Sequence, residues 1–262
     1  MSQAAVITVE RPAPPRALST DGEVIYAVGD IHGRYDLLKK ALAQIAVDCG
    51  DEGLGEGGRR LPMLILLGDY IDRGPDSAKV LQALVWLKRR GEFALRLLKG
   101  NHEQALLAFL EDPEAHEDWL GYGGAETLAS YGVTPPARGA GAPALGRARD
   151  ALLDQMPASH LQLLEELEPM VLVGDYAFVH AGVRPDRPLA YQAENDLLWI
   201  RRGFIDASGP FERVIVHGHT WLSEQPQVTE HRIGLDTGAY TTGVLTVARL
   251  DQEGMRLVQV RG

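Results

Sequence analysis

Residues 63–67 read Met-Leu-Ile-Leu-Leu, and Gly68-Asp69-Tyr70-Ile71-Asp72-Arg73-Gly74 follows directly. A short apolar run that ends in a turn signal predicts a buried strand. Two further strands are expected on the same grounds, at residues 23–28 and 93–98. Helical spacing of apolar residues separates the three runs, over residues 35–47 and 77–89. Strands that alternate with helices predict βαβ units and a parallel sheet, so the fold class is α/β.

The rest of the chain has a different pattern. Residues 102–168 are mainly helical in spacing, with a Pro/Gly/Ala-rich loop near 135–143, and a Gly-rich loop is expected at 48–60. Six short strand patterns follow and predict a second, mixed sheet: residues 170–173, 176–180, 213–217, 231–235, 243–248 and 255–260. We therefore expect one domain over residues 21–262, with a helical insertion at about 104–168. Residues 1–20 are rich in Pro and Ala and are predicted to be a disordered tail.

The composition favours a cytoplasmic protein. Of the 262 residues, 45% are hydrophobic and 24% are charged, which suits one large globular domain. Cys49 is the only cysteine, so an intrachain disulfide is excluded. No apolar run approaches the roughly 18 residues of a membrane helix, and the first residues lack a secretory-signal pattern. The formal net charge of −10 argues against a nucleic-acid partner, and nothing in the sequence indicates the oligomeric state.

Side chains able to bind metals follow the apolar strands in five turns. Besides the turn at 68–74, these are Gly29-Asp30-Ile31-His32-Gly33, Gly100-Asn101-His102-Glu103, His180-Ala181-Gly182 and His217-Gly218-His219-Thr220. Ligands in open α/β sheets bind outside the carboxyl ends of the strands. Carboxylate, imidazole and amide donors without a thiolate suit two divalent ions such as Mn, Fe or Zn. Asp30 and His32 are two residues apart and can share one ion, while Asp69 is placed to bridge both.

A single Gly-Asp turn is usually only a turn, because Asp favours turns and helix caps. Five such turns, each after an apolar strand, are too many for turn chemistry alone. The other histidines lack this pattern. We expect His116 to be solvated, His160 and His231 to be structural, and His217 to be buried rather than a ligand.

Together the five motifs resemble the calcineurin-like metallophosphoesterases, most closely the phosphoprotein-phosphatase branch of the bacterial and bacteriophage lambda type. That family has Gly-Asp-x-His-Gly, Gly-Asp-x-x-Asp-Arg-Gly, Gly-Asn-His-Glu and two later histidines, and all occur in order within residues 29–219. The resemblance implies the metallophosphoesterase fold, an αββα four-layer sandwich in which helices flank two packed mixed β-sheets. The chain departs from eukaryotic members at Lys99 and Ala181, and Trp221 stands where phosphodiesterases have a further histidine.

The resemblance also implies a role for each motif residue. The first metal ion would have three ligands: Asp30, His32 and Asp69. The second would have four: Asp69, Asn101, His180 and His219. His102 would be the general acid, oriented by Asp72. The phosphate would be bound by two arginines, Arg73 and Arg201, with Arg202 as the alternative to Arg201.

These roles imply a hydrolase that uses two divalent ions, most readily Mn²⁺, and attacks phosphorus directly with a metal-bridging hydroxide. The leading hypothesis is a protein serine/threonine phosphatase acting on phosphorylated proteins, peptides or small phosphomonoesters. One alternative is a symmetrical dinucleoside tetraphosphatase, whose bacterial members resemble the chain at Leu235-Asp236-Thr237-Gly238-Ala239. Trp119, Tyr122 and Trp221 could form its nucleoside pocket. The other alternative is a catalytically dead scaffold, although no ligand of the family pattern is missing.

Overall fold

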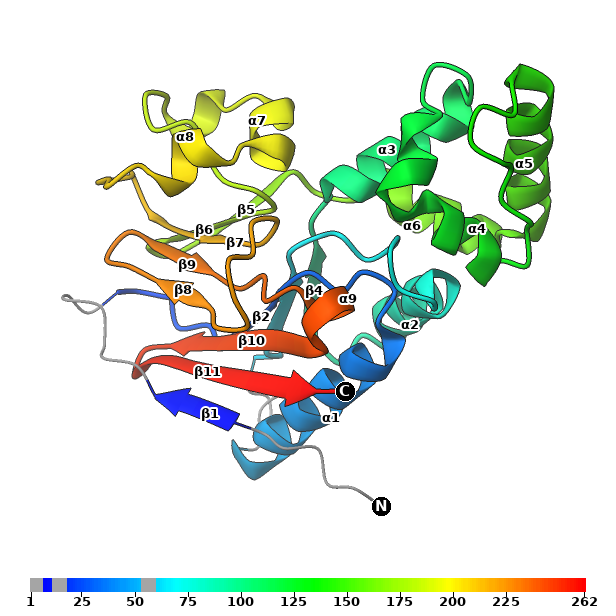
Figure 1. Ribbon diagram of the computed structural model, residues 1–262. Helices are drawn as coiled ribbons and strands as arrows, with labels where there is room; N and C mark the ends of the chain where they lie inside the picture. Colours follow the sequence, from blue (N-terminus) through cyan, green and yellow to red (C-terminus); the bar gives the residue numbers. More distant parts are fainter. Residues whose placement is uncertain (1–6, 11–17, 53–59) are drawn as a thin grey trace.

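The computed structural model describes residues 7–10, 18–52 and 60–262, which form two β-sheets flanked by helices (Figure 1). The first sheet has six strands in the order β1-β11-β10-β2-β3-β4, and the second has five in the order β5-β6-β7-β9-β8. The strands of the first sheet are β1 (Ile7–Glu10), β2 (Ile25–Val28), β3 (Met63–Leu66), β4 (Ala94–Leu97), β10 (Val244–Asp251) and β11 (Gly254–Arg261). Those of the second are β5 (Met170–Val173), β6 (Tyr176–Val179), β7 (Val214–His217), β8 (Gln227–Val228) and β9 (Arg232–Gly234). Each sheet has parallel and antiparallel pairs, so both are mixed, as predicted.

Helices cover the outer faces of both sheets. On the first sheet lie α1 (Tyr35–Glu52) and α2 (Ser77–Arg90), and on the second lie α7 (Glu194–Trp199) and α8 (Arg202–Ile205) (Figure 1). The segment between β4 and β5 is helical, as predicted: α3 (Asn101–Glu111), a π-helical turn η1 (Leu120–Gly124), α4 (Ala125–Ser130), α5 (Ala142–Gln155) and α6 (Ala158–Glu165). The turn η2 (Leu189–Tyr191) and the helix α9 (Ala239–Thr242) complete the described elements. Among the helices of the described residues, none is both long and apolar enough to span a bilayer.

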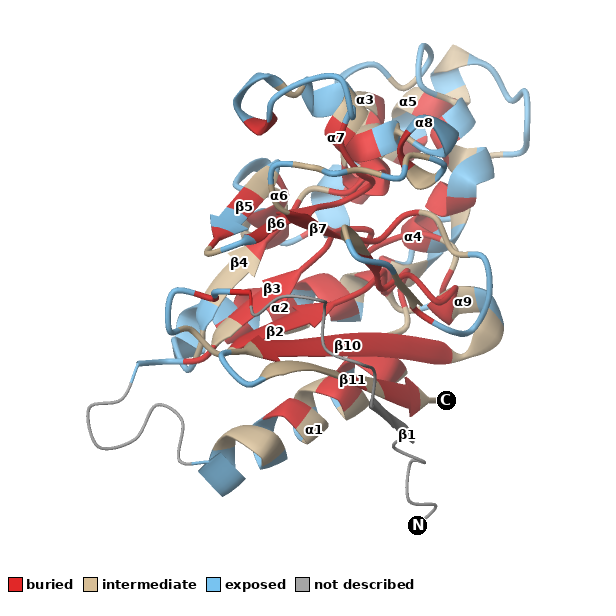
Figure 2. Ribbon diagram, turned by 90° about the vertical axis from the view of Figure 1, so that its left-hand side faces the viewer, coloured by how far each residue is buried: buried red, intermediate tan, exposed pale blue. Residues whose placement is uncertain are grey.

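Alternate side chains of each strand enter different layers of the core. In β2, Ile25 and Ala27 pack between the two sheets, whereas Tyr26 and Val28 pack against α1 and α2. The outer face of the second sheet packs with Phe204 of α8 in a third apolar cluster. Because side chains of a strand alternate between its faces, three apolar interfaces separate four layers. The predicted αββα sandwich is therefore confirmed, and Figure 2 shows its buried strands between exposed helix surfaces.

The strand register brings the candidate ligands to one edge. Val28 of β2 pairs with Leu66 of β3, which pairs with Leu97 of β4, and all three strands are parallel. In the second sheet, β6 and β7 are parallel, with Phe178 opposite Val216. The turns after β2, β3, β4, β6 and β7 therefore leave the two sheets at their carboxyl ends.

Two predicted features differ from the structure. Residues 243–248 and 255–260 were expected in the second sheet, but β10 pairs antiparallel with β2 of the first. An apolar strand pattern identifies no partner, because pairing depends on tertiary packing. In addition, α1 continues to Glu52 into the loop predicted at 48–60, and Arg249 of β10 pairs with Asp48 and Glu52 in that extension. Residues 53–59 lie outside the described residues.

The predicted tail, residues 1–20, also differs where it is described. Ile7 of β1 pairs with Gln259 of β11, which places this segment at the edge of the first sheet. Leu18 and Thr20 are buried. Disorder is therefore the wrong prediction for these residues, whereas 1–6 and 11–17 lie outside the described part of the chain.

Candidate metal centre

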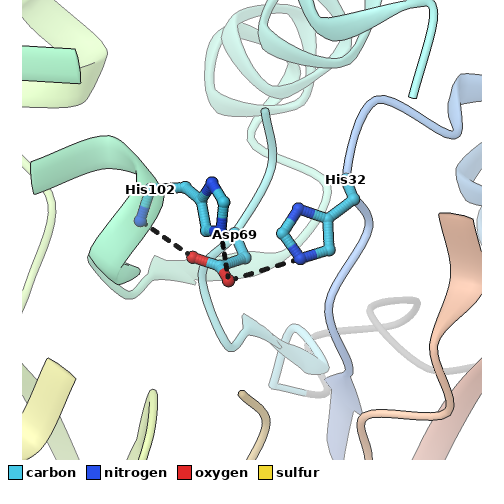
Figure 3. Close-up of side chains that lie close together, drawn as sticks. All are labelled: His32, Asp69 and His102. Atoms are coloured by element: carbon cyan, nitrogen blue, oxygen red, sulfur yellow. Dashed lines mark hydrogen bonds and ion pairs between the residues drawn. The ribbon is translucent and has the colours of Figure 1, made fainter. Parts of the chain in front are cut away.

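Asp69 lies among histidines from four different turns. Its Oδ2 is 3.4 Å from Nε2 of His32 and 3.9 Å from Nε2 of His102, as Figure 3 shows. Its Oδ1 is 3.4 Å from Nε2 of His180. Two groups of possible metal ligands share this carboxylate: His32, Asp69 and His102 in one, and Asp69, His180 and His219 in the other. Asp69 thus occupies the position that a bridging ligand requires.

Two buried atoms at this centre lack a hydrogen-bond partner among the described residues. Asp30 is nearly inaccessible, and its Oδ1 is unpaired although its Oδ2 accepts the His219 backbone N–H at 2.9 Å. The Nε2 of His219 is unpaired as well. Buried polar atoms are almost always satisfied, and unpaired ones require an explanation such as an ion. Two divalent cations, one beside each atom, would satisfy both, so the donor set fits a metal centre.

The histidines have the tautomers that metal binding needs. The Nδ1 of His32 lies 3.0 Å from the Ile71 carbonyl, and the Nδ1 of His180 lies 2.8 Å from the Leu67 carbonyl. Each Nδ1–H therefore donates to a carbonyl, which leaves Nε2 as the nitrogen that can bind a metal. In His180 this Nε2 lies 2.9 Å from Asn101 Oδ1, so the amide oxygen of Asn101 belongs to the second ligand group as well. Burial also lowers the pKa of His32 to about 3 and that of His219 to about 2. Both imidazoles are thus neutral near pH 7, the form that binds metals.

The buried carboxylates give the centre excess negative charge. Burial, together with repulsion from Asp236 and Asp69, raises the pKa of Asp30 well above its usual range. Burial raises the pKa of Asp236 to about 6. The positive charges of Arg73 and Arg201 act in the opposite direction on Asp236. Bound cations would remove this repulsion, which is a second reason why the site fits metal ions.

His102 is held by a carboxylate that is itself fixed on both oxygens. The Nδ1 of His102 is 2.6 Å from Asp72 Oδ2, and the Trp119 indole N–H donates to the same oxygen at 2.9 Å. Thr127 donates to Asp72 Oδ1 at 2.6 Å, and the Asp72 backbone N–H donates to Ser77 Oγ at 3.0 Å. Burial opposes protonation of His102, but the carboxylates of Asp69 and Asp72 raise its pKa overall. The imidazole is therefore oriented and made more basic, as a proton donor near neutral pH requires.

Arg73 lies at the edge of the first ligand group. Its Nη1 is 3.0 Å from His32 Nε2, and its guanidinium lies 4.7 Å from the ring centroid of Tyr240. Its backbone contacts Gly123, where an added Cβ would stand 2.4 Å from Arg73 N. Glycine is therefore required at this position of η1, since any side chain would displace Arg73.

Arg201 directly precedes α8 and acts electrostatically on two histidines of the second ligand group. It is exposed, and its charge lowers the pKa of His180 and of His219, in addition to the larger effect of burial. Arg202 is the first residue of α8 and is also exposed. The charge of Arg201 thus acts on two candidate ligands, so Arg201 stays the predicted phosphate-binding arginine and Arg202 the alternative.

The backbone is strained at the same positions. Six non-glycine residues of the described chain have positive φ, and five of them are candidate site residues: His32, Asp69, Asp72, Arg73 and His219. Left-handed conformations of such residues are costly and cluster at functional sites. The turns after the strands thus adopt unfavourable geometry that aims these side chains at one centre.

Several residues that position the site could not be given a role from the sequence. Glu103 was quoted in a motif without a role, yet its buried carboxylate accepts the backbone N–H groups of Asp69, Tyr70 and Gly100. Trp119 and Thr127 lie in the helical insertion, where no local pattern indicates a contact with Asp72. His217 is buried as expected, with Nδ1 3.0 Å from the Gly218 carbonyl.

Comparison with known proteins agrees with this geometry. The family model of the calcineurin-like phosphoesterases matches residues 24–244. The chain belongs to this family. It is similar to the symmetrical bis(5'-nucleosyl)-tetraphosphatase of Acidovorax sp. strain JS42, at 31% identity over 192 residues, 69% of this chain and 53% of the relative. The chain thus spans about half of that relative's length.

Other relatives carry both names that the motifs suggested. A symmetrical bis(5'-nucleosyl)-tetraphosphatase of Neisseria gonorrhoeae strain NCCP11945 is 26% identical over 279 residues, covering 90% of this chain and 96% of the relative. Serine/threonine-protein phosphatase 2 of Escherichia coli K12 is 36% identical over 102 residues, 38% of each chain.

Solved structures show the same fold. A crystal structure described as a candidate diadenosine tetraphosphatase has a TM-score of 0.60 at 21% identity, covering 94% of this chain and 96% of that chain. A Saccharomyces cerevisiae protein serine/threonine phosphatase has a TM-score of 0.61 at 17% identity, covering 93% of this chain and 81% of that chain. At these identities the likeness concerns the fold alone.

The shared carboxylate gives a direct test of the metal centre. We expect Asp69→Asn to lose most bound Mn²⁺ and nearly all turnover, because one substitution weakens both ligand groups. Metal content after dialysis and phosphate release from p-nitrophenyl phosphate measure the two effects. Asp154→Asn, an exposed position on α5, is the matched control. Wild-type turnover with unchanged metal content in Asp69→Asn would contradict a centre organised around this residue.

Proposed function

We propose that the chain is a metal-dependent hydrolase that cleaves a P–O bond at the centre around Asp69. The observation that carries the proposal is the combination of unpaired metal donors with a fixed His102–Asp72 pair. Asp30, His32 and Asp69 are the proposed ligands of one ion. The proposed ligands of the other are Asp69, Asn101, His180 and His219. Two divalent ions, Mn²⁺ being our first choice, would supply Lewis acidity and lower the pKa of water there.

The protein's own residues bind the substrate and transfer the proton. Arg73 and Arg201 bind the phosphoryl oxygens, because a guanidinium fork matches a phosphate in two places at once. Asp72 holds the imidazole of His102 through Nδ1, so that Nε2 faces the reacting group. His102 then donates its proton to the leaving oxygen. Tyr240 limits the positions open to Arg73 through the ring contact with its guanidinium.

Dinucleoside tetraphosphates are our leading substrate class, which reverses the order that the motifs alone favoured. The full-length similarity to a symmetrical tetraphosphatase supports this choice. Trp199 supports it as well. Its indole is 37% exposed, lies 6.5 Å from the His219 ring and is fixed by a 2.7 Å hydrogen bond to Gln104. An exposed, fixed ring beside a metal ligand can stack on a nucleobase. Trp119, an earlier candidate for this pocket, is buried against Asp72 instead.

Phosphorylated proteins are the second candidate substrate, and the His102–Asp72 pair favours them. A serine or threonine alkoxide is a poor leaving group, so protonation by a positioned acid accelerates its departure. A nucleoside diphosphate leaves readily without that proton. The hydrogen bonds from Trp119 and Thr127 hold Asp72, which orients the acid His102. A monoester substrate needs this acid more than a tetraphosphate does. A catalytically dead scaffold would not require an oriented His102–Asp72 pair beside the metal donors.

His102 is tested through the leaving group. We expect His102→Asn to lower kcat on an alkyl phosphate by about 10²–10⁴-fold, the usual contribution of a general acid. The loss should be much smaller on p-nitrophenyl phosphate, because nitrophenolate needs little protonation. Steady-state kinetics on both substrates decide the point. Equal losses on the two would mean that His102 acts in binding rather than in proton transfer.

The substrate class is tested by comparing kcat/KM for the two candidate substrates. We expect kcat/KM for diadenosine tetraphosphate to exceed that for phosphoserine peptides at least tenfold, about 1.4 kcal/mol in the transition state. Trp199→Ala should weaken the binding of the tetraphosphate by about 1–3 kcal/mol, the usual contribution of one stacked base. It should leave turnover of p-nitrophenyl phosphate unchanged. A tenfold preference for the peptide, with no effect of Trp199→Ala, would assign the chain as a protein phosphatase.

A further inference from the structure

A cavity lies away from the metal centre, between helices of the first helical layer and of the insertion. It has a volume of about 800 Å³ and is lined by residues of α1 and α2 and of the segment from α4 to α6, none of them a candidate site residue. Figure 1 shows α2 between α1 on one side and α4 and α6 on the other. Cavities of about 300–1,000 Å³ are typical of small-molecule sites. The size alone therefore suits a ligand as large as a mononucleotide.

The lysines that line this cavity have the opposite charge to the chain as a whole. The chain has a formal net charge of −10, yet the described residues that line the cavity include Lys39 and Lys79 and no carboxylate. Lys79 pairs with Asp76 at 2.6 Å, but its side chain is 65% exposed, and such pairs contribute little. Lys39 is exposed on α1. The two ammonium groups favour an anionic ligand.

The lining of the cavity includes aromatic rings and one oriented amide. Trp86 is 52% exposed, with the guanidinium of Arg90 5.3 Å from its ring centroid. The buried His160 has its Nδ1 2.8 Å from the Tyr131 hydroxyl and its Nε2 3.3 Å from Gln82 Oε1. When the Tyr131 hydroxyl donates to Nδ1, Nε2–H donates to Gln82, which orients the Gln82 amide. A fixed amide can recognise the donor–acceptor edge of a purine.

We propose that this cavity binds a purine mononucleotide. The base would lie against Trp86 with its edge toward Gln82, and the phosphate would meet Lys39 and Lys79. The site would be separate from the metal centre and would not cleave its ligand. A purely apolar ligand would make no use of the two ammonium groups or of the oriented Gln82 amide.

The cavity wall adjoins the residues that hold Asp72. Ala78 and Tyr131 line the cavity, and Ser77 and Ser130 directly precede them. Ser77 Oγ accepts the Asp72 backbone N–H at 3.0 Å, and Ser130 Oγ accepts the Ala78 N–H at 3.1 Å. A nucleotide that shifts the start of α2 would therefore move Asp72 and the imidazole that it holds. We expect the bound nucleotide to change kcat rather than KM.

The test is equilibrium dialysis of α,β-methylene-ADP against the Mn²⁺-loaded protein in excess inorganic phosphate. The phosphate occupies the metal centre, and the methylene bridge cannot be hydrolysed. We expect binding that phosphate does not displace, with Kd raised about tenfold or more by Lys39→Glu and by Trp86→Ala, or about 1.4 kcal/mol. Arg89→Glu, the same charge change on α2 but outside the cavity lining, should alter Kd by less than about twofold.

Two results would overturn the proposal. One is nucleotide binding that phosphate displaces completely. The other is phosphate-insensitive binding that Lys39→Glu and Trp86→Ala leave unchanged. Turnover of p-nitrophenyl phosphate tests the link to the centre. Nucleotide at a concentration equal to the wild-type Kd should change kcat clearly in the wild type and much less in Lys39→Glu, whose cavity would be mostly empty at that concentration. An unchanged kcat in the wild type would overturn that link.

Discussion

The carboxylate of Glu103 joins the two turns on which the candidate site depends. It accepts backbone N–H groups of Asp69 and Tyr70 from the turn after β3, and of Gly100 from the turn after β4. The same carboxylate lies beneath Asp69, so burial and the Asp69 charge raise its pKa to about 8, while the backbone N–H groups favour its anion. Each intramolecular hydrogen bond typically contributes about 0.5–1.5 kcal/mol to stability. A single buried side chain thus fixes the distance between Asp69 and the imidazole of His102.

The helical insertion supplies what the strand turns cannot provide. Trp119, Thr127 and Gly123 come from η1 and its neighbours, and they hold the turn that contains Asp72 and Arg73. This turn has left-handed backbone at both residues, with φ of 72° and 67°. The insertion therefore contributes to the reaction through backbone placement and through the hydrogen bonds that fill both oxygens of Asp72.

Much of the fold could be predicted from the sequence because the signals are local. Apolar runs followed by Gly-Asp or Gly-Asn predicted β2, β3 and β4 and the place of the ligands at their ends. The register of parallel strands then made the convergence of Asp30, Asp69 and Asn101 a geometric consequence. The membership of β10 and β11 in the first sheet could not be predicted, since two strand patterns do not reveal which edge they join. Glu103, Trp119 and Thr127 could not be assigned roles for the same reason, because each acts through a contact formed only in the folded chain.

We infer that Asp69 lies between two bound metal ions. An anomalous difference map of crystals grown with Mn²⁺ tests it most directly. We expect two peaks about 3.5–4 Å apart, the separation typical of two-metal sites, with the Asp69 carboxylate between them. One peak should lie beside Asp30 and His32, and the other beside His180 and His219. A single peak, or two peaks that the Asp69 carboxylate does not join, would contradict it.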